Sequence, residues 1–527
     1  MENKIMVGGS AALGNEDLLQ HILSRLPALS FASAACVNKS WNKVCNQILS
    51  KPKLASALSL SPSLHVAVSE VLDKVLSEPI RPHFAIASVG MQSKLAATHQ
   101  LITARLGSRT PVITNAVTGI IGLDAHLDEI CEVKWTVLED NLLNDFDHCY
   151  GIVLIVGYVP GLKVETIPLL RSKEEPEFSM VDKFLMDIRH YSASISGCSS
   201  PNGIILFGDQ NIDIKPILAE MDYGLPEETV IVGDATSCFL FKTGENSQNY
   251  NGALYFFDAV ALVFSRDSDN SNVPEIQFDV TMSTGVLPFG PELKAVSVKE
   301  HNADCSLLTA RMEGYDGLLH GEEILEDIKE HIDDKYPYLY IGVIHQRGSL
   351  QFGSRSYMSL YEVLGAEGQF FIVNGVGIKP GDSFIFYHSD SDTASSSSID
   401  VLDGLRLLNA SSCCGTIGRN VTNANKEVFG GLIFSCFSRS VPLSEDDDGD
   451  DDEDDNDVYF ESYPFCRNFP ETPLAGIFCY GEIGRGRGLT RLINQEEEDC
   501  SISGRCLLHH YSTVYLVMSY TIPPLLH

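Results

Sequence analysis

Apolar residues near the amino terminus follow the spacing of an amphipathic helix. One set falls on a single helical face and comprises Leu18, Leu19, Ile22, Leu23 and Leu26. Asn15 is a suitable N-cap, and Pro27 disfavours helical geometry at the residue before it. The pattern therefore predicts a first helix that ends at a Leu-Pro break.

Two further short helices are predicted before Pro52. Ser30 can cap the second helix, whose apolar residues are Phe31, Ala34, Ala35 and Val37. The third helix carries the apolar stripe Trp41, Val44, Cys45 and Ile48. Domains below roughly 40 residues usually need a metal, a disulfide or a partner. We therefore expect this unit to rest on another surface.

Beyond these helices, short β-type runs alternate with helical ones. A Ser- and Leu-rich stretch at residues 51–62 predicts a linker. Strands are predicted at 83–89, 111–117, 133–138, 151–156, 203–207, 254–264, 276–282, 338–344, 370–373, 383–387, 428–434, 476–480 and 511–520. Helices are predicted at 94–106, 179–194, 212–221, 322–332 and 394–408. Residues 402–409 match a leucine-rich-repeat phrase once, but a solenoid needs several stacked units, so we favour a helix there.

Length and charge narrow the class of protein. A chain of 527 residues with 44% apolar residues can fill several domain cores. It carries 71 acidic and 37 basic residues, and the net charge of -34 argues against nucleic-acid binding. Residues 445–457 are nearly all acidic, and such a block of like charge predicts a disordered loop inserted at 444–458.

Cysteine usage and hydropathy suggest a cytoplasmic or nuclear protein. The 14 cysteines occur in a long chain without a signal-peptide pattern, so we expect reduced thiols. No Cys-x-x-Cys pair occurs, and we predict neither a metal nor a cofactor. The longest apolar runs fall far short of the roughly 20 residues that span a bilayer, so we predict no membrane segment.

The first tenth of the chain resembles an F-box. The resemblance rests on the helix at residues 15–26, the Leu26-Pro27 break and the third-helix motif from Cys36 to Trp41. It departs from the usual pattern at Leu13-Gly14, where F-boxes commonly open with Leu-Pro. The family docks the small adaptor that links substrate receptors to a cullin scaffold. The resemblance assigns docking, or shaping of the docking face, to Leu18, Leu19, Ile22, Leu23, Leu26, Pro27, Val37 and Trp41. The alternative is an ordinary small helical bundle packed on the body.

The remainder is similar to the FIST domain pair, which occurs in bacterial sensory proteins and behind an F-box in some eukaryotic receptors. The matching stretches are residues 285–291, 429–439 and 473–484. The resemblance implies an α+β protein in which a small three-helix F-box precedes two related mixed α/β sheet domains. We expect an F-box-like unit with linker at 1–60, a FIST N-terminal-like domain at 61–270 and a FIST C-terminal-like domain at 271–527.

Three polar residues in the matching stretches form a candidate ligand pocket. Cys436, Arg439 and Glu482 supply a thiol, a cation and a carboxylate, which suit an amino-acid-like ligand or a nucleophilic mechanism. The family pattern usually has Gly after this Arg, whereas Ser440 stands here, and a bulkier residue could weaken such a site. The structural alternative is a packed thiol beside an Arg439–Glu482 pair.

These patterns predict a non-catalytic receptor rather than an enzyme. We expect the helical unit to bind the SCF adaptor and, through it, the cullin, while the body holds an unidentified protein substrate for ubiquitination and proteasomal degradation. The alternative function is small-ligand sensing by the FIST-like body. A third hypothesis, catalysis by Cys436, requires a depressed thiol pKa.

Overall fold

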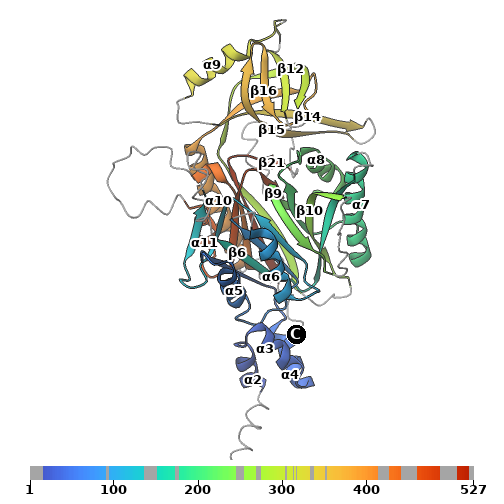
Figure 1. The fold of residues 1–527 in the computed structure, drawn as a ribbon, viewed down its shortest axis with the longest axis vertical. Coiled ribbons are helices and arrows are strands. Elements are labelled where there is room, and N and C mark those ends of the chain that lie inside the picture. Colours follow the sequence, from blue (N-terminus) through green and yellow to red (C-terminus); the bar gives the residue numbers. More distant parts are fainter. Residues whose placement is uncertain are drawn as a thin grey trace, which may run out of the picture.

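The computed structural model describes residues 16–90, 94–135, 151–172, 177–244, 255–268, 274–302, 305–312, 314–315, 317–332, 338–349, 353–413, 426–440, 460–486 and 507–521. Three short helices come first and project from one end of the molecule, while a β-barrel caps the other end (Figure 1). Asn15 and the acidic stretch at 444–458 lie outside the described residues.

The three N-terminal helices are α2 (Glu16–Leu23), α3 (Ala28–Ala35) and α4 (Lys39–Ile48). Their number and order match the prediction. The expected cap at Ser30 is wrong, because α3 begins at Ala28 with Pro27 as its N-cap residue. The fixed φ of proline suits a helix start. Asn38 does cap α4, since its Oδ1 accepts the backbone N–H of Trp41 at 2.9 Å.

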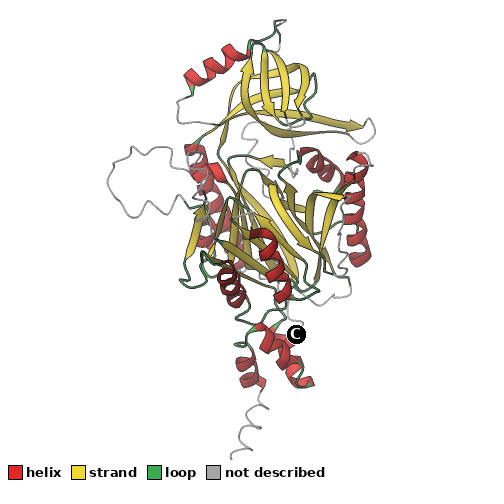
Figure 2. Cartoon of the chain, viewed as in Figure 1, coloured by secondary structure: helices red, strands yellow, loops and turns green. Residues whose placement is uncertain are grey.

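Two sheets pack face to face in the middle of the molecule (Figure 2). Within the described residues, ten strands form the larger sheet: β1 (Lys53–Ser59), β6 (Ile152–Tyr158), β2 (Phe84–Val89), β3 (Val112–Ala116), β9 (Val230–Lys242), β8 (Gly203–Asp209), β10 (Tyr255–Arg266) and β7 (Leu162–Ser172), with β20 (Glu482–Arg485) on β9 and β21 (Leu507–His509) on β20. The smaller sheet runs β11 (Glu275–Thr284), β22 (Ser512–Thr521), β18 (Lys426–Cys436), β19 (Leu474–Cys479), β4 (Gly119–Leu123) and β5 (Ile130–Lys134).

Helices cover the outer faces of both sheets. Helices α5 (Leu64–Val75), α6 (Leu95–Leu106), α7 (Glu177–Ser196) and α8 (Lys215–Gly224) pack on the larger sheet. Helices α10 (Ser391–Cys413) and α11 (Tyr463–Asn468) pack on the smaller sheet, and the 3-10 turn η3 (Phe437–Ser440) follows β18. Strands that are covered on both faces have apolar residues at almost every position. For this reason β2 and β6 could be predicted from the sequence.

A closed six-stranded barrel stands on the sandwich. It runs β12 (Val286–Asn302), β13 (Cys305–Met312), β16 (Phe370–Asn374), β15 (Gly353–Glu367), β14 (Leu339–Ser349) and β17 (Ser383–Ser389), and α9 (Gly321–His331) packs on it. Asp213 Oδ2 accepts the N–H of Val376 at 3.3 Å, and Tyr340 stacks on His510 at 5.2 Å between ring centroids. These contacts tie the barrel to the sandwich.

Two differences from the sequence-based expectations concern the architecture of the body. Residues 51–62 were expected to be a linker, but β1 lies there and pairs with β6. The barrel was not anticipated, although its strands β14, β16 and β17 were. The rest is a mixed α/β body behind a helical unit, consistent with the α+β class. No helix among the described residues is long and apolar enough to cross a membrane.

Close packing inside the larger sheet generates a test of stability. A Cβ placed on Gly157 would lie 2.1 Å from the Phe84 ring, its neighbour in register on β2. We expect Gly157→Ala to lower the free energy of unfolding by about 1–3 kcal/mol, because the added methyl overpacks the core. Scanning calorimetry should show a lower Tm. Adding Phe84→Leu should recover part of the loss, and an unchanged Tm in the single variant would contradict the predicted clash.

Candidate functional site

The three-helix unit has a small core of its own. Its buried residues are Leu19, Leu23, Phe31, Ala34, Val44 and Cys45, and Leu26 and Trp41 pack against them. Four of the eight predicted docking residues therefore shape the unit from inside. The other four, Leu18, Ile22, Pro27 and Val37, are exposed.

The unit rests on the body through the start of α3 and the end of α4. The N–H of Ala28 donates to the carbonyl of Leu76 at 2.9 Å, and the Tyr158 hydroxyl donates to the carbonyl of Leu49 at 2.8 Å. Leu49 packs on both the small core and the core beneath α5. This attachment meets the expectation that such a small unit leans on another surface.

An apolar set remains uncovered on the unit. Leu18 and Ile22 are each 41% exposed, Val37 is 60% exposed and Leu29 is 83% exposed. Leu29 was missed by the sequence analysis, because it lies outside the stripe that helical periodicity selected. Exposed apolar side chains gathered on a small unit at the end of a molecule are typical of a partner-binding surface.

The second candidate site lies at η3, in which Arg439 is almost fully buried. Its Nε lies 3.1 Å from Glu461 Oε1. Its Nη1 donates to the Ser283 carbonyl at 2.8 Å, and its Nη2 donates to Ser283 Oγ, the Ala394 carbonyl and Ser398 Oγ. All three guanidinium nitrogens are thus engaged by protein groups. The expected pairing of Arg439 with Glu482 is wrong, because Glu461 takes that place.

Strand β5 holds both chain segments that flank residues 441–459. Lys134 Nζ donates to the Phe437 carbonyl at 2.6 Å, and Glu132 Oε1 accepts the N–H of Ser462 at 2.6 Å. Burial lowers the pKa of Lys134 to about 8 and raises that of Glu132 to about 7. Together with the Arg439–Glu461 pair, these contacts form a clamp that we call the β5 clamp.

Glu482 is fully buried and lies opposite Asp234 where β20 pairs with β9. Ser512 Oγ donates to Glu482 Oε2 at 2.7 Å, and Thr236 N–H donates to Asp234 Oδ1 at 2.9 Å. Burial raises the pKa of Glu482 well above its ordinary value and that of Asp234 to about 6. Burial, and after it the nearby Asp234 carboxylate, thus favour the protonated form of Glu482.

Cys436 ends β18 and is buried near Glu482. Burial, and then the nearby Glu482, raise the pKa of its thiol far above the ordinary value. A reactive thiol needs a depressed pKa, so the surroundings of Cys436 disfavour nucleophilic catalysis. An amino-acid-like ligand would have to displace the partners of Arg439 to use its charge. Among the described residues, no group of three or more His, Cys, Asp or Glu side chains is arranged to hold a metal ion.

Comparison with known proteins matches the three-helix unit to a domain family and the whole chain to one relative. The F-box domain model matches residues 15–53, which contain α2, α3 and α4. A protein of Arabidopsis thaliana named F-box/LRR-repeat protein At5g63520 is 40% identical over 524 residues. The alignment spans 96% of this chain and 93% of that protein. The single leucine-rich phrase of the present chain, at residues 402–409, lies within helix α10.

The buried ion pair generates a prediction about stability. Arg439→Met should lower the free energy of unfolding by about 3–5 kcal/mol, because it leaves the Glu461 carboxylate buried without its cation. Scanning calorimetry measures the change as a lower Tm. The double variant Arg439→Met/Glu461→Gln removes both charges and should be more stable than the single variant. Equal Tm values for the single and double variants would show that the pair carries no such coupling.

The raised pKa of Asp234 generates a pH prediction. Its folded-state pKa of about 6 exceeds the ordinary value of 3.8, so its contribution to stability is present at low pH and is lost as pH rises toward and through 6. Asp234→Asn keeps a neutral amide in place at every pH. Between pH 5 and pH 7, the stability of the variant relative to the native chain should rise by roughly 1 kcal/mol. A difference that is constant with pH would contradict the raised pKa.

Proposed function

This chain belongs to the family of F-box proteins, and from that premise we propose that it is the substrate-recognition subunit of an SCF ubiquitin ligase. In this role the three-helix unit binds the SCF adaptor and, through it, the cullin scaffold. The larger body binds a protein that is then ubiquitinated and degraded by the proteasome. We propose a cytoplasmic or nuclear location, where such ligases and reduced thiols are found together.

The observation that carries this proposal is the uncovered apolar set on the three-helix unit. Leu18 and Ile22 lie one helical turn apart on α2, and Val37 lies on the turn between α3 and α4. Burial of apolar surface stabilises an interface by roughly 25 cal/mol per Å². A helical partner surface that covers these side chains would gain this energy without any rearrangement of the small core beneath.

The shape of the molecule suits a receptor. The three-helix unit and the barrel lie at opposite ends of the molecule, with the sandwich between them (Figure 1). Adaptor docking at one end therefore leaves the sandwich and barrel surfaces free for a substrate. The transfer chemistry belongs to the partner enzymes, and this chain contributes proximity between the substrate and the charged ubiquitin.

We further propose that the body is of the FIST type, divided near residue 270. Two of the three stretches that resemble this family, 429–439 and 473–484, lie side by side, since β18 and β19 are parallel neighbours and β20 follows β19 after two residues. The two proposed halves share both sheets, because β4 and β5 extend the smaller sheet while β20 and β21 extend the larger one. On this proposal the halves form one continuous substrate-binding body.

Direct binding to the adaptor tests the receptor function. We expect the double variant Ile22→Asp/Val37→Asp to raise the Kd for the purified SCF adaptor at least about tenfold, because each Asp would place an uncompensated charge in a desolvated apolar interface. Isothermal titration calorimetry measures the Kd. Leu19 is unsuitable for this test, because it is buried in the small core and its replacement by Asp would unfold the unit.

A matched control separates docking from general surface effects. Leu127→Asp/Leu407→Asp changes two leucines of the body that are 67% and 69% exposed. This variant should bind the adaptor as the native chain does, and all three proteins should share one Tm. Failure of the native chain to bind any SCF adaptor would overturn the proposed function.

A further inference from the structure

A cleft of about 520 Å³ lies beside β11, at one end of the sandwich. One wall is β11 itself, from Glu275 to Asp279. The other wall consists of loop residues before β8 and β9 and of the first residue of β9, namely Ser200, Pro201, Asn202, Pro226, Glu228, Thr229 and Val230. The cleft thus lies where the two sheets part.

The cleft follows the edge of β11 rather than one of its faces. Successive side chains of a strand point to opposite faces, so a cleft over one face would touch alternate residues. All five residues 275–279 line this cleft, including Ile276 and Phe278 of the inner face and Gln277 of the outer face. Only the backbone edge is common to all five.

No described strand pairs with the outer edge of β11. β11 is the terminal strand of the smaller sheet, and among the described strands it pairs only with β22. In an antiparallel pair, alternate residues direct their N–H and C=O groups away from the partner strand. The opposite wall cannot supply a complementary strand, because two of its residues are prolines and the Val230 N–H already donates to Asn202.

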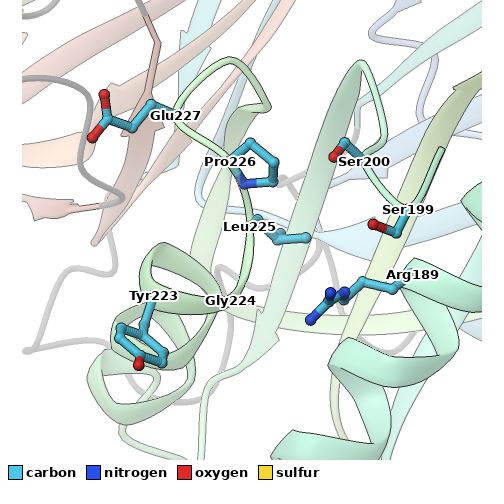
Figure 3. A pocket seen from close by; sticks show the side chains of 8 residues that line it. All are labelled: Arg189, Ser199, Ser200, Tyr223, Gly224, Leu225, Pro226 and Glu227. Atoms are coloured by element: carbon cyan, nitrogen blue, oxygen red, sulfur yellow. The ribbon is translucent and has the colours of Figure 1, made fainter. Parts of the chain in front are cut away.

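A second hollow of about 230 Å³ continues the cleft, since both are lined by Ser200 and Pro226. Figure 3 shows Ser199 and Ser200 facing Leu225 and Pro226 across this hollow, with the Arg189 side chain extending beneath them. The continuous path has room for more than a single side chain. An extended segment rises about 3.3 Å per residue, which suits such a path.

Charge indicates what kind of segment fits beside β11. Glu228, Glu275 and Asp279 line the larger cleft, and no Lys or Arg lines it within the part of the chain that the structure describes. Asp279 is paired with Lys426 at 2.6 Å, whereas among the described residues the ion pair of Glu275 is with an exposed Arg266 at 3.7 Å, a contact that solvent weakens. A second copy of this chain would bring the same carboxylates to the edge, and like charges opposite one another are destabilising. The occupant should therefore be basic.

We propose that the β11 edge is the substrate-binding site, and that it takes an extended, lysine- or arginine-rich segment of the substrate as an added strand. This inference rests on the proposed receptor function and specifies the substrate class. The backbone of the segment pairs with the outer edge of β11, and its basic side chains meet Glu228 and Glu275. Strand addition supplies affinity, while the carboxylates select for basic side chains.

The test uses the full chain bound to its adaptor and a labelled nine-residue peptide of alternating valine and lysine. Fluorescence anisotropy measures the Kd, and hydrogen exchange locates the protected amides. We expect Glu228→Lys/Glu275→Lys to weaken binding at least tenfold and the peptide to protect residues 275–279. The matched variant Glu322→Lys/Glu323→Lys places the same charge change on exposed residues of α9 and should bind as the native chain does.

Backbone methylation of the peptide separates strand addition from simple charge attraction. Methylating one alternating set of amides should weaken binding at least tenfold, whereas methylating the other set, which points away from β11, should not. Equal binding by both methylated peptides, or equal loss in both charge variants, would overturn the proposal. Adaptor binding is measured on the same preparations. If the adaptor binds and the peptide does not, the substrate site is wrong and the receptor function stands.

Discussion

The apolar contact between the two central sheets is the interaction on which the rest of the structure depends. Its core draws side chains from strands far apart in the chain, including Phe84, Phe207, Phe264, Phe434 and Leu516. Because both sheets bury their inner faces there, each needs helices outside to cover the other face. The barrel, the three-helix unit and the polar clusters are all placed by their attachment to this sandwich.

The same short helices meet two opposing demands. Leu19 and Leu23 must stay inside to hold three helices together, while Leu18 and Ile22 stay outside. Helical periodicity places all four on one broad stripe and cannot divide them. That division depends on the angle at which α4 crosses α2, which only the folded unit determines. For this reason the sequence identified the F-box helices correctly but could not separate their surface from their core.

Sequence patterns predicted the strands and helices whose own residues show a clear apolar pattern. Strands β2, β6 and β8 are apolar at most of their positions, and α7 keeps a helical period. β1 was missed because Ser56 and Ser59 interrupt its apolar run; both are buried, and they donate to the Leu474 carbonyl and to Glu70. β9 was missed because Gly233 and Asp234 resemble a turn. The partner of Arg439 could not be found either, since Glu461 lies beyond a long acidic stretch and meets it only in the fold.

The β5 clamp has a consequence for how this chain can change in evolution. The segments before residue 441 and after residue 459 are fixed to β5 and to each other by Lys134, Glu132 and the Arg439–Glu461 pair. The packing of the smaller sheet therefore depends on these fixed segments and not on the length or composition of residues 441–459. We therefore expect a change in the length of that stretch, or a reporter domain inserted there, to leave the sandwich folded.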